Sequence, residues 1–303
     1  MNPDISVIIP TYNRRAMVRE AIGSVLAQSF QDFELIVIDD GSGDATDQEI
    51  SQLTDDRIRY KSVEHGGPAA ARNRGVELAR APMIAFLDSD DLWAQDKLER
   101  QIALMRANPA CAISQTGEKW IRNGRRVNPG TRHRKRAGDI FVDSLRTCLI
   151  SMSATIMRTE LFRALGGFDE IMLAAEDYDL WLRILIAHEC GLLDEPLVTR
   201  RGGRSDQTSA ATPALDRFRI LALTKLLEDE RLSPARRSAV VEVLAEKCRI
   251  YAGGLRRRGR IDVARFYEDV AEQAKHWEVR AVAEIACAIE SMRTMLRETS
   301  HEC

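Results

Sequence analysis

Three aspartates, Asp88, Asp90 and Asp91, follow directly after the short apolar run of residues 83–87. The run predicts a buried strand, so the end of this strand presents a cluster of carboxylates. Like charges this close disfavour one another's ionised form, and a hydrogen-bonded turn, an arginine or a divalent cation usually compensates. We predict the cation. The alternative is that Asp88 and Asp90 form a turn and Asp91 caps a helix that begins near Trp93.

A second acidic strand end favours a bound ligand over a simple turn. The apolar run of residues 33–39 closes on Asp39 and Asp40, and an earlier β-branched run, residues 6–9, ends at Pro10. Helical spacing of apolar residues follows each run, and two more strands lead to the aspartate cluster. Strand and helix thus alternate, which predicts a mostly parallel sheet with helices on both faces. Ligands bind such sheets outside the carboxyl ends of the strands, where these acids fall.

The alternation weakens after residue 108. Residues 119–136 are polar and rich in arginine. We expect a long loop or hairpin there that contacts a diphosphate or an anionic acceptor, and a solvated basic surface is the alternative. From about residue 213, three segments carry apolar residues at helical spacing, around residues 215–227, 238–251 and 261–274. The sequence therefore predicts an α/β domain of residues 1–212 and an α-helical C-terminal extension of residues 213–303.

The composition excludes several classes of protein. Of the 303 residues, 45% are hydrophobic and 30% are charged, and the net charge of −2 offers no electrostatic reason to expect nucleic acid as a partner. The six cysteines show no zinc or redox spacing, which is typical of reduced thiols in the cytoplasm. No secretion signal or transmembrane run is visible. Peripheral contact with the inner face of a membrane through residues 255–260 is an alternative to a solvated helix connection.

Familiar phosphate-binding signatures are missing. Gly41 and Gly43 follow a strand, but the third glycine of a dinucleotide fingerprint would fall at Thr46. The sequence contains neither a P-loop nor the zinc motif His-Glu-x-x-His. A nucleotide bound by this chain must therefore be held in another way.

Six short motifs follow one another over about two-thirds of the chain. They are Val-Ile-Ile-Pro-Thr-Tyr-Asn-Arg at residues 7–14, Val-Ile-Asp-Asp-Gly-Ser at 37–42, Gly-Pro-Ala-Ala-Ala-Arg-Asn-Arg-Gly at 67–75, Phe-Leu-Asp-Ser-Asp-Asp at 86–91, Gly-Gly-Phe-Asp at 166–169 and Glu-Asp-Tyr-Asp-Leu-Trp at 176–181. In this order and spacing they resemble glycosyltransferase family 2. The resemblance implies the GT-A fold of nucleotide-diphospho-sugar transferases, which has a Rossmann-like sheet. It assigns no chemistry to the helical extension.

The resemblance implies a site for a nucleoside-diphosphate sugar. Its expected nucleotide-binding residues are Pro10, Thr11, Tyr12, Arg14, Asp39, Arg72 and Asp88. Tyr12 offers a flat face to the base, Asp39 accepts a hydrogen bond from the base, and Asp88 holds the ribose hydroxyls. Arg72 is expected to reach phosphate or to brace the acids, and an ordinary helix ion pair is the alternative. For Tyr12 the alternative is a side chain that fills the strand–loop junction.

Asp90 is the metal ligand that the resemblance implies. It would coordinate Mn²⁺ or Mg²⁺ that bridges the two phosphates and neutralises the charge building on the departing diphosphate. Asp91 is expected to cap the helix instead. Many relatives carry a histidine beyond a later strand, but residues 200–209 contain none. Arg204 or Arg201 could bind the diphosphate there, and the third protein ligand of the metal stays open.

The expected catalytic base is Asp177, with Glu176 as the second candidate. A carboxylate within hydrogen-bond reach can take the proton from an acceptor hydroxyl. Both residues open a predicted helix over residues 176–188, where the helix dipole also favours acids, so an ordinary helix start is the alternative. One displacement assisted by one base inverts the anomeric centre.

These expectations describe a cytoplasmic, metal-dependent, inverting glycosyltransferase. It would move a sugar from a nucleoside-diphosphate donor, with UDP as the expected nucleotide, to a hydroxyl-bearing glycan or lipid-linked acceptor in glycan or cell-surface polysaccharide synthesis. One alternative is a nucleotidyltransferase of related fold, which should have a glycine- and lysine-rich loop after the first strand. Another is a sugar-nucleotide-binding module that is not an enzyme, which would have no use for the base.

Overall fold

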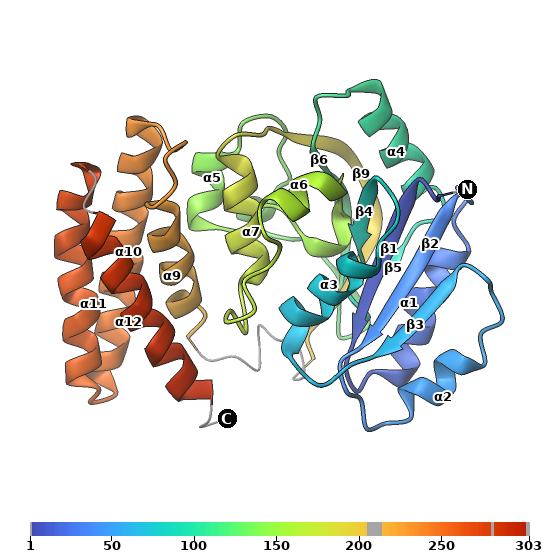
Figure 1. Ribbon diagram of the computed structural model, residues 1–303, viewed down its shortest axis with the longest axis horizontal. Helices are drawn as coiled ribbons and strands as arrows, with labels where there is room; N and C mark the ends of the chain where they lie inside the picture. Colours follow the sequence, from blue (N-terminus) through green and yellow to red (C-terminus); the bar gives the residue numbers. More distant parts are fainter. Residues whose placement is uncertain (1, 205–213, 280–281, 301–303) are drawn as a thin grey trace. The chain divides into compact units, whose positions relative to one another are not determined.

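The structure, a computed structural model, describes residues 2–204, 214–279 and 282–300 (Figure 1). The chain divides into two compact units. The first comprises Met1–Ile140, Leu149–Leu173 and His188–Gln207, and the second comprises Phe141–Cys148, Ala174–Ala187 and Thr208–Cys303. The predicted domain boundary at residue 212 lies outside the described residues. Both candidates for the catalytic base, Glu176 and Asp177, belong to the second unit.

A nine-stranded sheet forms the centre of the first unit, within the described residues. Its strands are β1 (Ile5–Thr11), β2 (Phe33–Asp39), β3 (Ile58–Ser62), β4 (Met83–Phe86), β5 (Leu92–Trp93), β6 (Ile113–Arg122), β7 (Arg125–Val127), β8 (Thr155–Arg158) and β9 (Cys190–Gly202). They lie in the order β3-β2-β1-β4-β8-β6-β9-β5, with β7 beside β6. The parallel pairs are β1–β2, β2–β3, β1–β4 and β6–β9. Strands β5, β7 and β8 are antiparallel to their neighbours. The predicted α/β class with a mostly parallel sheet is confirmed.

Helices cover both faces of this sheet because side chains alternate along each strand. The helices of the unit are α1 (Arg15–Leu26), α2 (Thr46–Ser51), α3 (Gly67–Leu78), α4 (Lys97–Ala107) and α6 (Thr159–Ala164). Val7 and Ile9 of β1 share a buried core with Val18 of α1. Ile8 points to the opposite face and lies against Gly75 of α3, where a Cβ atom would have no room. Glycine at this position therefore lets α3 approach the sheet closely.

The arginine-rich stretch begins with the expected hairpin. Strands β6 and β7 pair through a turn at Asn123 and Gly124. Both turn residues are left-handed, with φ of 49° and 74°. Asn-Gly suits a two-residue hairpin turn because these residues adopt positive φ with little strain.

The predicted helix near Trp93 is wrong. Leu92 and Trp93 form β5, which pairs with β9, and α4 begins only at Lys97. The indole N–H of Trp93 donates to the carbonyl of Ser153 at 2.7 Å, and its backbone N–H donates to the hydroxyl of Ser24 at 3.2 Å. These contacts with distant residues hold the segment extended, and no local pattern indicates them.

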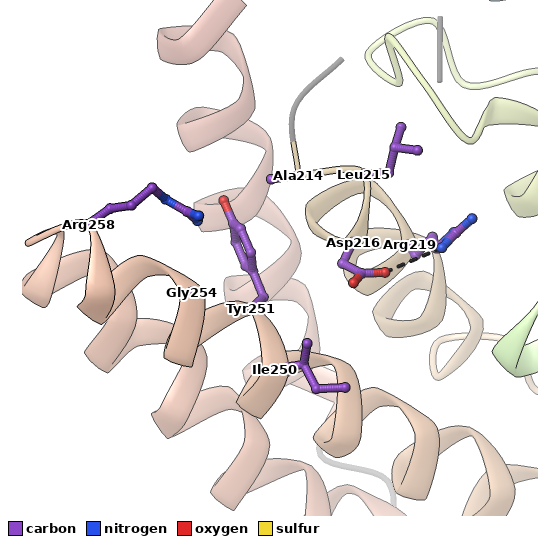
Figure 2. Close-up of a pocket in the computed structure, with 8 residues that line it drawn as sticks. All are labelled: Ala214, Leu215, Asp216, Arg219, Ile250, Tyr251, Gly254 and Arg258. Carbon is purple, nitrogen blue, oxygen red and sulfur yellow. Dashed lines mark hydrogen bonds and ion pairs between the residues drawn. The ribbon is translucent and has the colours of Figure 1, made fainter. Parts of the chain in front are cut away.

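The second unit is helical in its described residues. Its elements are α5 (Phe141–Arg146), α7 (Glu176–Leu185), α9 (Asp216–Leu226), α10 (Pro234–Arg257), α11 (Ile261–Gln273), a 3₁₀ helix (Ala274–Val279) and α12 (Val282–Ser300). The predicted C-terminal helices are thus confirmed. Residues of α9 and α10, with those just before α9, line an open hollow of about 360 Å³ (Figure 2). None of the helices in the described part of the chain is long and apolar enough to cross a membrane.

Lys97, at the start of α4, is completely buried in the first unit. Its ammonium lies 4.0 Å from the centroid of the Trp93 ring and has no hydrogen-bond partner among the described residues. Burial lowers the pKa of Lys97 well below its ordinary value. The interaction with the indole ring therefore offsets only part of the free energy needed to bury this charge.

Replacing this lysine should stabilise the fold. We expect Lys97→Met to raise the free energy of unfolding at neutral pH by about 1–2 kcal/mol, because a buried charge is replaced by an apolar chain of similar length. The unfolded chain retains the lysine proton up to a higher pH than the folded chain. The free-energy cost of burying Lys97 in the native protein therefore decreases as the pH rises toward the ordinary lysine pKa. Urea unfolding at neutral and alkaline pH would measure a gain that shrinks with pH. Lys61→Met, at an exposed lysine, is the control, and an equal gain there would contradict the explanation.

Candidate active site

The loops that follow β1 and β2 are joined by hydrogen bonds. The carbonyl of Thr11 accepts from the N–H of Asp40 at 2.9 Å. Asn13, with a left-handed φ of 50°, accepts through its side chain from the N–H of Gly43 at 2.8 Å, and its own N–H donates to the hydroxyl of Ser42 at 2.8 Å. The predicted nucleotide-binding residues Pro10, Thr11 and Tyr12 therefore lie beside the acidic end of the neighbouring parallel strand.

The two aspartates at the end of β2 have different partners. Asp39 is buried, and its carboxylate accepts from the N–H of Ser42 at 2.9 Å and from the hydroxyl of Tyr60 at 2.8 Å. Burial, followed by the contact with Asp39, raises the pKa of Tyr60. Asp40 instead accepts from the N–H groups of Gly66 and Gly67 at 2.8 and 2.9 Å. Asp40 thus fixes the start of α3, whereas Asp39 is held by the loop after β2 and by Tyr60 of β3.

Tyr12 is 44% exposed, so it does not fill the strand–loop junction. Its ring stacks on His65, with 4.2 Å between the centroids and 24° between the planes. The imidazole Nδ1 of His65 lies 2.9 Å from a carboxylate oxygen of Asp40. His65 and Tyr60 are contacts of the site that sequence reasoning missed, because no local pattern marks either residue.

An arginine lies beside each of the first two aspartates of the cluster, Asp88 and Asp90. Arg72 of α3 donates to Asp88 at 2.7 Å, and its side chain is only 7% exposed. Nη1 of Arg14 lies 3.3 Å from a carboxylate oxygen of Asp90. Because β4 pairs with β1, and β1 with β2, the predicted nucleotide residues of the three strand ends share one edge of the sheet. Two cations and three carboxylates therefore meet there.

The third aspartate, Asp91, does not cap a helix, and this prediction is wrong. Its carboxylate is buried and accepts from the hydroxyl of Ser153 at 2.7 Å and from the N–H of Arg201 at 2.9 Å. The hydroxyl of Ser153 also accepts from the N–H of Asp88 at 3.1 Å. Burial raises the pKa of Asp91 well above its usual range, and the charges of Asp88 and Asp90 raise it further. Asp91 thus fixes the loop of residues 87–91 between β4 and β5, which we call the acidic loop, to the interior of the first unit.

Arg201 holds the same loop from the end of β9. Its guanidinium donates to the carbonyl of Asp90 and forms an ion pair with Glu20 of α1. Arg204 approaches the thioether of Met17. The predicted contact of Arg201 or Arg204 with a diphosphate stays a prediction. In this structure Arg201 braces the loop.

The acids at this edge suit a hard cation that is shared with a substrate. Among the described residues no group of three or more His, Cys, Asp or Glu side chains could hold a metal ion. Mg²⁺ in nucleotide sites, however, is commonly bound by one or two carboxylates together with substrate phosphates. Asp90, with Asp88 two residues away, offers such a set of oxygen donors. The residues therefore fit a cation that arrives with a diphosphate.

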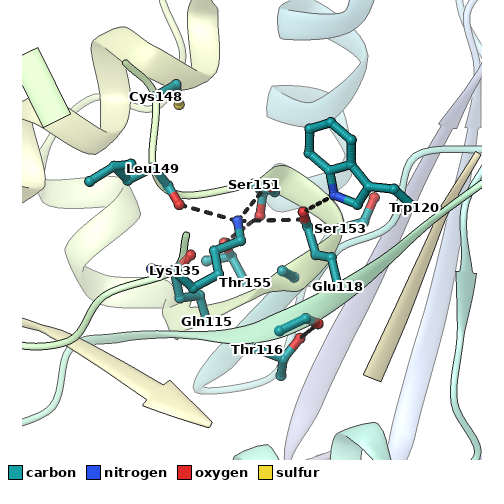
Figure 3. Close-up of polar contacts among 12 residues, drawn as sticks. Gln115, Thr116, Glu118, Trp120, Lys135, Cys148, Leu149, Ser151, Ser153 and Thr155 are labelled. Carbon is teal, nitrogen blue, oxygen red and sulfur yellow. Dashed lines mark hydrogen bonds and ion pairs between the residues drawn. The ribbon is translucent and has the colours of Figure 1, made fainter. Parts of the chain in front are cut away.

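A buried ion pair lies on β6 of the same unit. Glu118 and Lys135 have side chains that are 4% and 8% exposed, and their charged atoms are 3.5 Å apart (Figure 3). Lys135 also donates to the carbonyl of Leu149 at 3.1 Å and to the hydroxyl of Ser151 at 2.6 Å, and the indole N–H of Trp120 donates to Glu118 at 2.8 Å. Burial by itself would raise the pKa of Glu118, but the charges of Lys135 and Arg200, together with hydrogen bonds, outweigh burial and lower the pKa. A solvated basic surface therefore does not describe Lys135.

Glu176 and Asp177 open α7 in the second unit. The preceding residue, Ala175, is left-handed with φ of 59°. The carboxylate of Asp177 accepts from the N–H of Tyr178 at 2.7 Å, and the thiol of Cys148 lies 3.8 Å from its other oxygen. Tyr178 is buried in the helical core. The roles of Asp177 and Glu176 in catalysis stay predictions.

Removing the hydroxyl of Ser153 should loosen the acidic loop. We expect Ser153→Ala to lower the free energy of unfolding by about 1–3 kcal/mol, because a buried carboxylate oxygen and the N–H of Asp88 each lose a partner. Urea unfolding followed by circular dichroism measures this change. Ser144→Ala is the matched control, because the buried hydroxyl of Ser144 has no hydrogen-bond partner among the described residues. Equal effects of both substitutions would rule out the bridging role of Ser153.

Comparisons with known proteins agree with the motifs. The family model described as "Glycosyl transferase family 2" matches residues 6–166. An uncharacterized glycosyltransferase of Rickettsia typhi is 32% identical over 239 residues, which are 76% of this chain and 75% of the relative. The UDP-Glc:alpha-D-GlcNAc-diphosphoundecaprenol beta-1,3-glucosyltransferase WfgD of Escherichia coli is 35% identical over 182 residues, 60% of this chain and 69% of WfgD. A longer relative from Rickettsia felis is 38% identical over 198 residues, 64% of this chain, and the match spans only 32% of that relative's length.

Solved structures share the fold at low identity. S. aureus TarS 1–349 in complex with UDP-GlcNAc has a TM-score of 0.62 and 21% identity, over 90% of this chain and 92% of TarS 1–349. The mannosyltransferase PcManGT from Pyrobaculum calidifontis, in complex with GDP-Man and Mn²⁺, has a TM-score of 0.58 and 18% identity, over 92% of this chain and 87% of PcManGT. These two likenesses concern the fold alone.

Proposed function

Because the chain belongs to glycosyl transferase family 2, we propose that it is an inverting glycosyltransferase with a UDP-linked sugar as donor and a hydroxyl group as acceptor. The observation that carries the proposal is the edge of the sheet where the ends of β1, β2 and β4 bring Asp39, Asp88 and Asp90 beside Arg14 and Arg72. A diphosphate needs cations, and a ribose and a base need hydrogen-bond acceptors, so this edge offers both.

The nucleoside occupies the part of the edge near Tyr12. The exposed ring of Tyr12 provides a flat face for the base. Asp39, whose carboxylate is held by Tyr60 and the N–H of Ser42, accepts a hydrogen bond from the N–H that uracil carries. Asp88 accepts from the ribose hydroxyls. Binding of UDP-GlcNAc by TarS and use of UDP-Glc by WfgD support the choice of UDP.

The diphosphate lies toward Arg14, Arg72 and Asp90. When bound at Asp90, Mn²⁺ or Mg²⁺ supplies positive charge that stabilises the departing nucleoside diphosphate. Arg14, now 3.3 Å from Asp90, and Arg72, now paired with Asp88, add guanidinium donors for phosphate oxygens. The presence of Mn²⁺ with GDP-Man in PcManGT supports the need for a cation.

Asp177 acts as the general base, and Glu176 is the second candidate. A carboxylate removes the proton from the acceptor hydroxyl while the oxygen attacks the anomeric carbon from the face opposite the nucleotide, which inverts that carbon. The acceptor is a glycan or a lipid-linked sugar, as the lipid-linked substrate in the name of WfgD suggests. We place the reaction in glycan or cell-surface polysaccharide synthesis at the cytoplasmic side of the membrane.

Removing the charge of Asp90 should abolish metal binding at the donor site while the chain still folds. We expect UDP with Mn²⁺ to raise the melting temperature of the native chain more than UDP alone, and Asp90→Asn to abolish that difference, because a neutral amide is a poor ligand for a hard cation. A thermal shift assay measures it. Asp96→Asn, at a half-exposed aspartate whose side chain caps no N–H of α4, is the control. An unchanged response to Mn²⁺ in Asp90→Asn would remove Asp90 from the ligand set.

Neutralising the base should block transfer and leave donor binding intact. We expect Asp177→Asn to bind UDP as the native chain does but to release UDP from the sugar nucleotide about 10²–10⁴-fold more slowly, the usual contribution of general base catalysis. A panel of sugar nucleotides with Mn²⁺, assayed for UDP release, identifies the donor and measures the rate. Glu176→Gln is the matched comparison. Full activity of Asp177→Asn together with loss in Glu176→Gln would transfer the role to Glu176.

A further inference from the structure

The turn between α10 and α11 gathers four arginines within five residues, Arg256, Arg257, Arg258 and Arg260, which we call the arginine tip. Gly259, with φ of 74°, ends α10 and lets the chain reverse. The N–H of Arg260 donates to the carbonyl of Leu255 at 3.0 Å, and the N–H of Gly259 donates to that of Arg256 at 3.0 Å, which is the pattern of a Schellman motif. The arginines are therefore held together by a defined turn.

All four arginines of the tip are exposed. Arg256 forms an ion pair with Glu268 of α11. Within the part of the chain that the structure describes, no ion pair is found for Arg257, Arg258 or Arg260. The helix dipole favours basic residues in the last turn of α10, but it does not account for Arg260, which follows the turn. The tip thus carries positive charge that the unit itself does not neutralise.

Exposed aliphatic side chains flank the tip. Ile250 of α10 is 59% exposed, and Ile261, the first residue of α11, is 38% exposed. Ile250 lies about two helical turns before Arg258, the C-cap residue of α10, and both residues line one side of this helix. Together with the arginines, the two isoleucines form a mixed aliphatic and basic surface, which an interface between water and lipid accommodates.

The hollow of about 360 Å³ opens on this same face (Figure 2). Arg219, Ile250, Tyr251 and Arg258 are among the residues that line it, and Gly254 contributes no side chain. One acid, Asp216, also lines it, but Asp216 lies 3.4 Å from both Arg219 and Lys247. The hollow is therefore a partly apolar depression with an excess of positive charge, suited to an anionic headgroup.

We propose that the arginine tip, Ile250, Ile261 and this hollow form a docking surface for a bilayer that contains anionic lipids. The arginines contact headgroup phosphates, and the two isoleucines enter the boundary between headgroups and acyl chains. Nucleic acid fits less well, because bases stack on exposed aromatic rings. The exposed side chains beside the tip are isoleucines, Tyr251 is half-buried against Tyr267, and the chain has a net charge of −2. The proposal depends on the second unit alone and is independent of the donor site.

The full chain should therefore sediment with vesicles of phosphatidylcholine that contain phosphatidylglycerol, and not with vesicles of phosphatidylcholine alone. Binding should weaken as salt is added, since salt screens the attraction. Each basic side chain near an anionic surface raises binding by roughly fivefold. We expect the triple variant Arg257→Gln, Arg258→Gln and Arg260→Gln to bind about 100-fold more weakly. Ile250→Ser should weaken binding severalfold without changing the charge.

A second triple variant serves as the matched control. Arg122→Gln, Arg125→Gln and Arg126→Gln removes three exposed, clustered arginines of the first unit and changes the net charge equally. It should bind vesicles as the native chain does. The thermal shift that UDP causes in each variant reports on the donor site. A variant that loses vesicle binding but keeps the normal UDP shift has therefore lost the docking surface alone. The proposal fails if anionic vesicles do not bind the native chain, if both triple variants lose binding equally, or if the tip arginines bind single-stranded RNA and no vesicles.

Discussion

The buried carboxylate of Asp91 is the contact on which the candidate site depends. It accepts from Ser153 and from the N–H of Arg201, and these residues come from chain segments far from one another in the sequence. A buried carboxyl group destabilises the fold unless hydrogen-bond partners satisfy it. These contacts hold the loop after β4 with Asp91 turned inward. This arrangement leaves Asp88 and Asp90 beside Arg72 and Arg14.

The acids at the sheet edge divide into two kinds. Asp40 and Asp91 accept backbone N–H groups and hold loops in place, whereas Asp88 and Asp90 meet guanidinium groups. An edge where arginines already balance carboxylates can admit a diphosphate and a cation together without a large change in net charge. Such an edge would bind either ligand poorly alone. This charge balance is why the proposed function links the donor to a metal.

Buried charges elsewhere show how tertiary contacts decide the role of a residue. Lys135 belongs to a polar, arginine-rich stretch, yet it is buried against Glu118 because the stretch folds back onto β6 and the segment around Ser151. Lys97 is buried against an aromatic ring with no hydrogen-bond partner among the described residues. The arginine tip is the opposite case, since a tight turn at Gly259 keeps its charges in solvent. Charge in the sequence therefore predicts neither burial nor exposure by itself.

The sequence by itself determined the alternation of strands and helices as far as β4, the fold class and the family. These follow from periodicity and from short motifs, which are local: the runs at β1, β2 and β4 and the acids that follow them needed no long-range information. Only the tertiary structure decided that Asp91 is an anchor, that Trp93 lies in a strand, and that Ser153, Tyr60 and His65 contact the site residues. Each of these depends on residues that are distant in the chain. A buried polar group such as Asp91 forms the hydrogen bonds that the folded interior offers, and a local sequence pattern does not show which residues will be buried together.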